Sequence, residues 1–239
     1  MTRFLVCILL FFSSATMIRA QKTINDANAE KRAVGSFHGV DVATGIKLIL
    51  TEGNTEEVAV SAATTVFRDR IITKVEGGIL KIFYENKLRS INTKKEKKEL
   101  KAYVSYKTLD VLNANTGAAV EIEGVLKSTI LKMDVHTGAE ISGKVDIGDL
   151  DVDQGTGSTV VLFGEAGKLS VDGDTGSMFK GIDLKTSNCS VTASTGAGIY
   201  ITVQKELSVK ANTGGFVKYK GDAGIREIKT NSGGSVTKI

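Results

Sequence analysis

The sequence contains no proline and no tryptophan, although 239 residues at average usage would include about a dozen prolines. This absence excludes collagen, proline-rich linkers and polyproline stalks. Aromatic residues are also few, at 6%, and only two cysteines are present. Glycine, in contrast, occurs 26 times, and 41% hydrophobic residues with near-balanced charge favour a folded core over disorder. Abundant glycine without proline indicates many tight bends and few backbone N–H groups that can stay unpaired.

The first twenty residues have the features of a secretory signal peptide. Arg3 supplies the positive charge, and the apolar run from Phe4 to Phe12 is too short to span a bilayer. Cleavage after Ala20 is preferred, and cleavage after Ala15 is the alternative. We therefore expect an exported chain with a flexible N-terminal segment over residues 21–30.

The exported chain would have one cysteine and almost no net charge. Loss of Arg3 and Arg19 leaves two fewer basic residues than the whole chain, 29 against 27 acidic residues. A net charge of about +2 gives no reason to expect a nucleic-acid partner. Cys189 alone cannot form an intramolecular disulfide, and no second segment is long enough to cross a membrane.

A Thr-Gly or Ser-Gly pair recurs along the chain at a nearly constant spacing. From Gly117 onward, the glycines of successive pairs are 21, 19, 19, 20, 18 and 19 residues apart, and one earlier copy lies in the N-terminal third. The pairs are Thr44-Gly45, Thr116-Gly117, Thr137-Gly138, Thr156-Gly157, Thr175-Gly176, Thr195-Gly196, Thr213-Gly214 and Ser232-Gly233.

Each regular repeat alternates apolar and polar residues around its glycine. The positions five before and three after the glycine are always apolar, as Met133 and Ile141 are around Gly138. A period of two with many β-branched residues is typical of strands with one buried face. Cys189 takes an inward position that holds leucine in most copies, so we expect a buried core thiol.

These repeats predict an all-β parallel β-helix. About 19 residues at roughly 3.3 Å each trace a coil of about 60 Å, which suits one rung of such a solenoid. Each rung is expected to contain a strand, the Thr-Gly bend, a second strand and a variable return. Glycine can take positive φ at the bend, and we expect the threonines to face inward or to lie at the corner edge as a hydroxyl ladder.

The domain organisation follows from the regularity of the repeats. Residues 31–239 are expected to form one β-helix domain, with irregular rungs over 31–111 and regular Thr-Gly repeats over 112–239. Residues 85–101 interrupt the alternation with many lysines and are interpreted as a solvated loop.

Residues 32–40 and 46–53 resemble the start of the putative auto-transporter adhesin, head GIN domain family, and residues 71–80 and the repeated small-Gly-small bends are similar to it as well. The resemblance covers about residues 31–239. It implies a right-handed β-helix exported to the periplasm, the outer surface or the medium of a Gram-negative bacterium. The family's usual bend is Ser-Gly-Ala-Ser, whereas threonine mostly replaces the first serine here. The resemblance carries over no catalytic residues.

Three aspartates are the candidates for chemistry. Asp134, Asp153 and Asp172 each lie four residues before their glycine and would stack in one column on adjacent rungs. Like charges at that spacing repel, and no arginine or histidine shares the column. We interpret the column as a solvated acidic strip, with a weak cation site or a catalytic site as alternatives.

Four apolar residues take outward positions shortly after consecutive bends. They are Val161, Met178, Tyr200 and Phe216. We expect them to form one exposed apolar patch, a feature that usually marks an interface or a ligand groove. Coverage by the return segment or by self-association is the alternative.

The sequence favours an exported, non-enzymatic β-helix protein without a cofactor. It would act as an adhesin or envelope-interaction module that binds a surface protein or a glycan through a side face. One alternative is a polysaccharide-acting lyase or hydrolase, because parallel β-helices host such enzymes. Another is a self-assembling envelope scaffold, in which the rung ends or the apolar patch would form a homo-oligomer.

Overall fold

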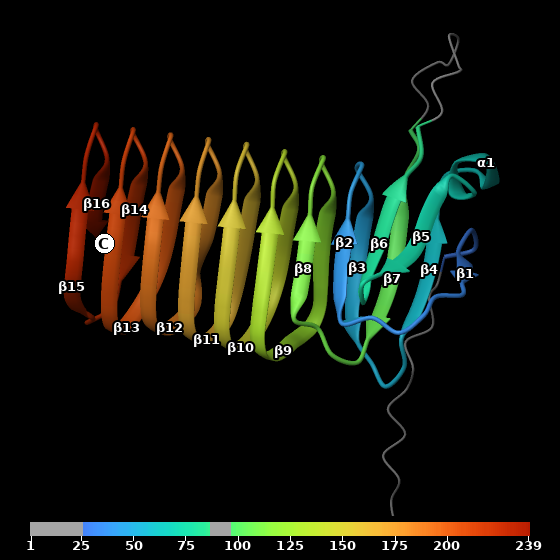
Figure 1. The fold of residues 1–239 in the computed structure, drawn as a ribbon, viewed down its shortest axis with the longest axis horizontal. Coiled ribbons are helices and arrows are strands. Elements are labelled where there is room, and N and C mark those ends of the chain that lie inside the picture. Colours follow the sequence, from blue (N-terminus) through green and yellow to red (C-terminus); the bar gives the residue numbers. More distant parts are fainter. Residues whose placement is uncertain (1–25, 87–96) are drawn as a thin grey trace, which may run out of the picture.

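The computed structural model describes residues 26–86 and 97–239, whose regular secondary structure is almost entirely strand (Figure 1). About seven parallel coils of roughly 19 residues, which we call rungs, stack as a β-solenoid with 65% strand and 2% helix. The predicted all-β parallel solenoid is therefore confirmed. The predicted signal peptide (1–20) lies outside the described residues, as do half of the predicted flexible segment (21–30) and the middle of the lysine-rich stretch (85–101).

The regular rungs are built from long strands that pair in parallel with the strands of the rungs before and after. In this register Ile141 pairs with Val120 on one side and with Val160 on the other, so equivalent positions of the repeat stack. The strands are β8 (Val111–Ala114), β9 (Ala119–Val135), β10 (Glu140–Gln154), β11 (Thr159–Gly173), β12 (Met178–Ala193), β13 (Gly198–Ala211), β14 (Phe216–Lys220), β15 (Gly224–Thr230) and β16 (Ser235–Lys238).

The far side of each central rung differs from the expected variable return, because it is itself strand. From β9 to β13 one continuous strand runs between successive corners and bends on the way. Register shifts next to Gly143 and Gly164 mark β-bulges, and these glycines have φ values of 149° and 110°. A Cβ atom on Gly164 would lie 2.2 Å from the carbonyl oxygen of Val145. The second bend therefore depends on glycine and not on a loop.

At the Thr-Gly corners both residues adopt positive φ, whereas the sequence had pointed only to the glycine. Thr156 has a φ of 49° and Gly157 a φ of 70°. The N–H of Ser158 donates to the carbonyl oxygen of Gly155 at 3.3 Å, which closes a two-residue turn of type I′. From Thr116 onward the corner threonines are exposed at the edge and do not face inward. Because β-branched residues rarely adopt positive φ, each corner stores backbone strain.

Backbone hydrogen bonds run through the corners from rung to rung. The N–H of each corner glycine except the last donates to the carbonyl oxygen of the threonine or serine in the next corner, at 3.0–3.1 Å. The first of these bonds joins Gly45 to Thr116, although a long excursion of the chain separates them in sequence. The corners consequently line up along one edge of the solenoid (Figure 1).

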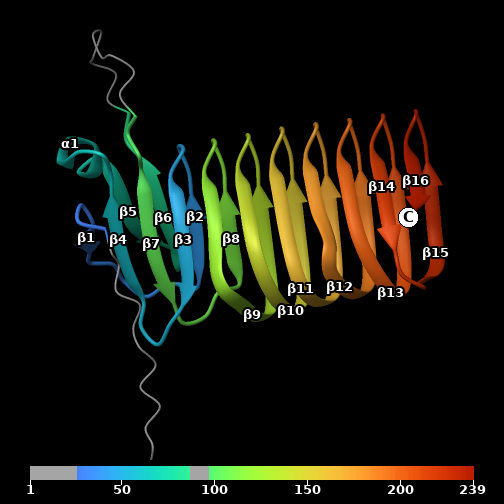
Figure 2. The ribbon, with the colours of Figure 1, turned by 180° about the vertical axis from the view of Figure 1, so that it is seen from behind.

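Irregular strands cover the N-terminal end of the solenoid. The elements are β1 (Glu30–Arg32), β2 (Gly39–Val42), β3 (Lys47–Glu52), β4 (Glu57–Ser61), α1 (Thr65–Arg68), β5 (Ile71–Glu76), β6 (Ile79–Tyr84) and β7 (Lys101–Tyr106). β6 and β7 stack in parallel on β2 and β3, and the antiparallel strands β5 and β4 then cover them. β1 pairs with β4, so β1, β4, β7 and β3 lie side by side (Figure 2). The short helix α1 had no counterpart in the sequence prediction.

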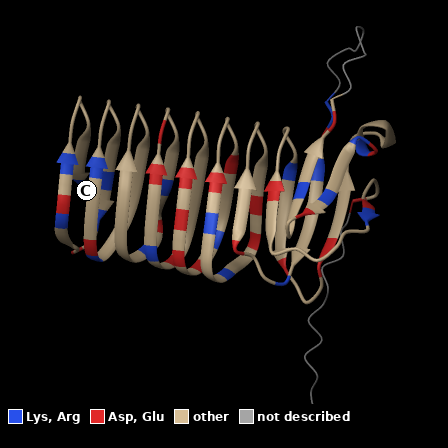
Figure 3. Cartoon of the chain, in the orientation of Figure 1, with Lys and Arg blue, Asp and Glu red and all other residues tan. Residues whose placement is uncertain are grey.

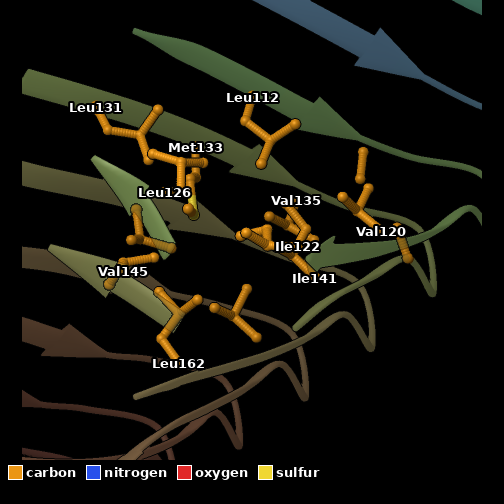
Figure 4. Close-up of a cluster of buried hydrophobic side chains, with 14 of the residues drawn as sticks. Leu112, Val120, Ile122, Leu126, Leu131, Met133, Val135, Ile141, Val145 and Leu162 are labelled. Carbon is orange, nitrogen blue, oxygen red and sulfur yellow. The ribbon is translucent and has the colours of Figure 1, made fainter. Parts of the chain in front are cut away.

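The predicted inward positions form the core in every rung but the last. Five residues before the corner glycine, Leu112 and Met133 are fully buried, and Cys189, seven residues before its corner glycine, is only 5% exposed. Side chains from successive rungs meet in one interior (Figure 4). In the last rung the equivalent Ile228 is 42% exposed, because no described strand lies beyond it.

Substitutions at one corner should separate the strain of its two residues. Thr156→Asn should raise the free energy of unfolding by about 0.5–1 kcal/mol, because asparagine tolerates positive φ better than threonine. Gly157→Ala should lower it by about 1 kcal/mol through backbone strain alone, since no atom lies within 4 Å of the added Cβ. Urea unfolding measures both values. If Thr156→Asn were instead less stable, the threonine side chain would stabilise the fold by more free energy than its backbone strain costs.

Candidate functional site

The strand register stacks the three candidate aspartates in one column. Asp134 pairs with Asp153, and Asp153 pairs with Asp172, on three adjacent rungs. We call these three aspartates the acidic column. Farther along the same sheet face, the positions in line with them hold Lys210 and Lys229. The sign of the charge therefore changes along a single line of side chains.

The carboxylates of the acidic column affect one another. Partial burial, followed by the charges of Asp153 and Asp174, raises the pKa of Asp172. Limited compensation comes from Lys132, whose Nζ lies 3.6 Å from Asp134, and His136 Nε2 lies 3.8 Å from a carboxylate oxygen of Asp153. Among the described residues, no three histidine, cysteine or acidic side chains are arranged to hold a metal ion. The cation site therefore remains a prediction.

Three of the four predicted patch residues meet on the opposite side of the corner. The rings of Tyr200 and Phe216 contact edge to face, with centroids 5.7 Å apart. Met178, Gly198 and Phe216 stack in one column, and a Cβ atom on Gly198 would meet both neighbouring side chains within 2.8 Å. Because Gly198 has no side chain, the side chains of Met178 and Phe216 can pack over its backbone. Lys218 Nζ lies 5.7 Å from the Tyr200 ring centroid. We call these five residues the aromatic surface.

Val161 does not join the aromatic surface directly. It pairs with Lys180, which in turn pairs with Tyr200, so a lysine separates the two apolar residues. The patch residues are half-buried and less exposed than expected. The sequence prediction did not include Gly198 and Lys218. Their distances from the corner glycine, two and four residues, place Gly198 in the column of Met178 and Phe216 and Lys218 in the column of Tyr200.

A shallow hollow of about 320 Å³ lies where the rungs bend away from the corner. Its charged residues are held in ion pairs. Lys168 Nζ lies 3.7 Å from Asp149, and Arg226 lies 2.6 Å from Glu206. Asp149 and Glu206 stand three rungs apart in the register, a separation of about 14 Å at the usual strand spacing.

Cys189 lies in the core beside a hydroxyl group. Its Sγ is 2.7 Å from Thr186 Oγ1, and this hydroxyl group donates to the carbonyl oxygen of Thr202. Burial raises the pKa of the thiol to about 11, although the contact with Thr186 acts in the opposite direction. At neutral pH Cys189 is therefore a protonated core side chain and not a nucleophile.

Comparison with known families identifies the fold's relatives. The sequence profile of the putative auto-transporter adhesin, head GIN domain family matches residues 36–223. The chain belongs to this family. The expected membership is thus confirmed for most of the described head GIN domain. None of the curated proteins matches the sequence significantly.

Solved structures share the fold of this head GIN domain at low sequence identity. A putative adhesin from Bacteroides fragilis matches with a TM-score of 0.79 and 16% identity, covering 88% of this chain and 96% of the other. A putative adhesin from Parabacteroides distasonis matches with a TM-score of 0.68 and 14% identity, covering 88% and 96%. A putative lipid binding protein from the same species matches with a TM-score of 0.61 and 18% identity, covering 90% and 98%.

Asp172→Asn should stabilise the folded head GIN domain at pH 7. The pKa of Asp172 is raised on folding, so its contribution to stability falls as pH rises from the unfolded to the folded pKa. The amide removes this penalty. The gain should vanish below about pH 3.9, where both states are protonated, and should shrink in salt because the side chain is exposed.

Urea midpoints at pH 7 and pH 3 test this expectation, with the exposed Asp183→Asn as the control. A loss of stability for Asp172→Asn at pH 7 would contradict it and would indicate that the acidic column holds a cation.

Cys189 should resist thiol–disulfide exchange with an added disulfide reagent in the folded protein at pH 8. In a chain that begins at Gln21 it is the only cysteine, so thiol release measured with a chromogenic disulfide reports on it alone. Its raised pKa and its burial keep the thiolate scarce and inaccessible, whereas in urea the thiol should react rapidly with a pKa near about 8.5. Equal rates in both states would show that the core opens readily at β12.

Proposed function

We propose that the chain is an exported, non-enzymatic adhesin whose aromatic surface holds a partner at the bacterial envelope. The observation that carries the proposal is the edge-to-face pair of Tyr200 and Phe216 on an outward sheet face. Aromatic rings offer a large contact area at a small cost in side-chain entropy, and such pairs are frequent at binding sites. Because β13 and β14 are paired strands of the sheet, the rings are held on a rigid base.

The chemistry around the rings favours a surface glycan over a protein partner. Lys218 lies near both rings, at 5.7 Å from the Tyr200 centroid and 6.0 Å from the Phe216 centroid. The rings can cover the apolar face of a sugar while the ammonium group contacts hydroxyl or carboxylate groups. A polysaccharide of the envelope would combine these features.

The arrangement of carboxylates supports a non-enzymatic role. Acid and base groups of glycoside hydrolases face each other across a bond at about 5–9.5 Å. The aspartates of the acidic column lie side by side on one sheet face. The two carboxylates in the hollow, Asp149 and Glu206, are far apart, and each forms an ion pair with a basic residue. Neither set resembles a converging pair.

The proposed location rests on the family and on the N-terminal sequence. The structural relatives include proteins named putative adhesin, and one is named putative lipid binding protein. Residues 1–20 have the composition of a signal peptide. In the part of the chain that the structure describes, no helix is long and apolar enough to cross a membrane.

The affinity of the double variant Tyr200→Ser, Phe216→Ser for the partner should fall by at least about tenfold. This factor corresponds to roughly 1.4 kcal/mol, the free energy of one aromatic contact. The chain beginning at Gln21 is screened against glycan and envelope-polysaccharide panels, with turnover followed in the same samples. The unfolding midpoint should fall moderately, because half-buried rings lose less burial than core residues do, and the variant should remain folded at the temperature of the binding assay.

Val66→Ser provides the matched control, because Val66 is exposed on α1 at the N-terminal end. It should bind like the unaltered chain. Binding that survives loss of both rings would refute the aromatic surface, and release of product from any polysaccharide would establish an enzyme.

A further inference from the structure

One column of outward residues crosses the aromatic surface along the solenoid axis. Val161 pairs with Lys180, Lys180 pairs with Tyr200, and Tyr200 pairs with Lys218, on the four strands from β11 to β14. Each of these residues lies four positions after its corner glycine, and we call the four the lysine–tyrosine column. Neighbouring strands are about 4.8 Å apart, so the two lysines start about 10 Å apart with Tyr200 between them.

The two lysines of this column have no carboxylate partner. Among the residues that the structure describes, neither Lys180 nor Lys218 forms an ion pair within this chain. The ammonium group of Lys218 lies near the two rings of the aromatic surface instead. Basic residues of the last rung are different, as Arg226 and Lys229 each pair with a glutamate. An anion can therefore bind the column without first breaking an ion pair.

The positions around the lysines add no negative charge. The adjacent column, two positions after the corner glycine, holds Thr159, Met178, Gly198, Phe216 and Ser235 from β11 onward. Toward the N-terminal end, the first acidic residue in either column is Glu140, which pairs with Thr159. The sheet face that carries the acidic column differs, because acidic residues recur there on successive rungs (Figure 3). Positive charge and aromatic rings are thus combined on one face only.

A further exposed ring lies on the same face. Phe163 is 45% exposed and stands two residues after Val161 in β11, with a buried residue between them. Because β11 is two rungs from β13, Phe163 and Tyr200 are about 10 Å apart along the solenoid axis. Phe163, Lys180, Tyr200 and Lys218 consequently alternate ring and ammonium group over four successive rungs.

This alternation fits a linear polysaccharide that lies along the solenoid axis. Each sugar of an extended chain advances by a distance close to the strand spacing, so successive sugars lie over successive rungs. An aromatic ring covers the apolar face of a sugar, and an ammonium group binds a carboxylate. A protein strand is a poorer match, because β11, β12 and β13 are paired on both sides and offer no free backbone edge.

We propose that this face binds an acidic polysaccharide in which uronic acids alternate with neutral sugars. The carboxylates pair with Lys180 and Lys218, and the neutral sugars cover the rings of Phe163 and Tyr200. The inference rests on the proposed binding of a glycan by the aromatic surface. It adds the charge of the glycan, the direction of the bound chain and the two residues Phe163 and Lys180.

The probe is a fluorescent decasaccharide of alternating glucuronic acid and N-acetylglucosamine. Its counterpart is the same chain with every carboxyl group reduced to an alcohol. The full chain beginning at Gln21 should bind the acidic form at least about tenfold more tightly in fluorescence anisotropy, and added salt should reduce this difference. Equal affinity for the two forms, or no binding of the acidic form, would overturn the proposal.

Variants test the contribution of each side chain. Lys180→Gln and Lys218→Gln should each weaken binding of the acidic form by about threefold or more and leave the reduced form unaffected, whereas Lys180→Arg should bind normally. Phe163→Ser should weaken binding of both forms. Lys210→Gln is the matched control, because it removes the same charge from the face of the acidic column.

Two results with these variants would contradict the site. Unchanged affinity in both Lys180→Gln and Lys218→Gln would refute it. An equal loss in Lys210→Gln would show that only the net charge of the protein matters, which would refute it as well. Circular dichroism verifies that each variant is folded.

Failure of this inference differs from failure of the proposed function. A neutral glycan that is lost in Tyr200→Ser, Phe216→Ser, with no preference for the acidic decasaccharide, would leave the aromatic surface in place and refute the charge assignment. Binding that survives the loss of both rings would refute the proposed function, and this inference with it. A glutamate-rich peptide that binds as tightly as the acidic decasaccharide would overturn the assignment to a polysaccharide.

Discussion

Parallel backbone pairing between rungs is the constraint on which the rest of this molecule depends. It holds not only along the strands but also through the corners, where each glycine N–H reaches the carbonyl oxygen of the next corner. For that bond to recur, every corner must have the same backbone shape, and the shape requires positive φ at two successive residues. The ladder stays continuous at the cost of backbone strain at threonine in each corner, or at serine in the last one.

This pairing makes each rung copy the chemistry of the last. Residues at equal distances from the corner stand directly above one another, so apolar residues merge into one interior and polar ones form columns. A column has no freedom to separate like charges, and the charge of Asp153 therefore adds to partial burial, the larger cause, in raising the pKa of Asp172. The same stacking brings Met178 and Phe216 together over Gly198, since the glycine leaves room for both.

Much of this arrangement could be predicted from the sequence, because the spacing of the Thr-Gly pairs fixes which residues stack. The corners, the inward columns and the acidic column follow from counting along the chain. The second bend did not, since its bulges fall at unequal distances from the corner glycine. Gly143 lies five residues after Gly138, whereas Gly164 lies seven residues after Gly157. The apolar patch was placed by inside–outside alternation alone. Alternation separates inside from outside but does not show which side chain stands on the rung between two others, so Val161 was grouped with Tyr200 although Lys180 separates them. The N-terminal cover has no repeat at all, and its pairing is set by contacts distant in sequence.

The corner ladder also means that the solenoid has a unit of length. Removing residues 139–157 would join Gly138 to Ser158, keep the shape of the corner and place β11 directly on β9. The molecule would shorten by about 4.8 Å, the distance between neighbouring strands, while both ends stayed as they are. Duplicating the same segment would lengthen it by the same step. Relatives of this chain can therefore differ in length by whole rungs. Each added or removed rung changes the distance between the aromatic surface and the N-terminal end.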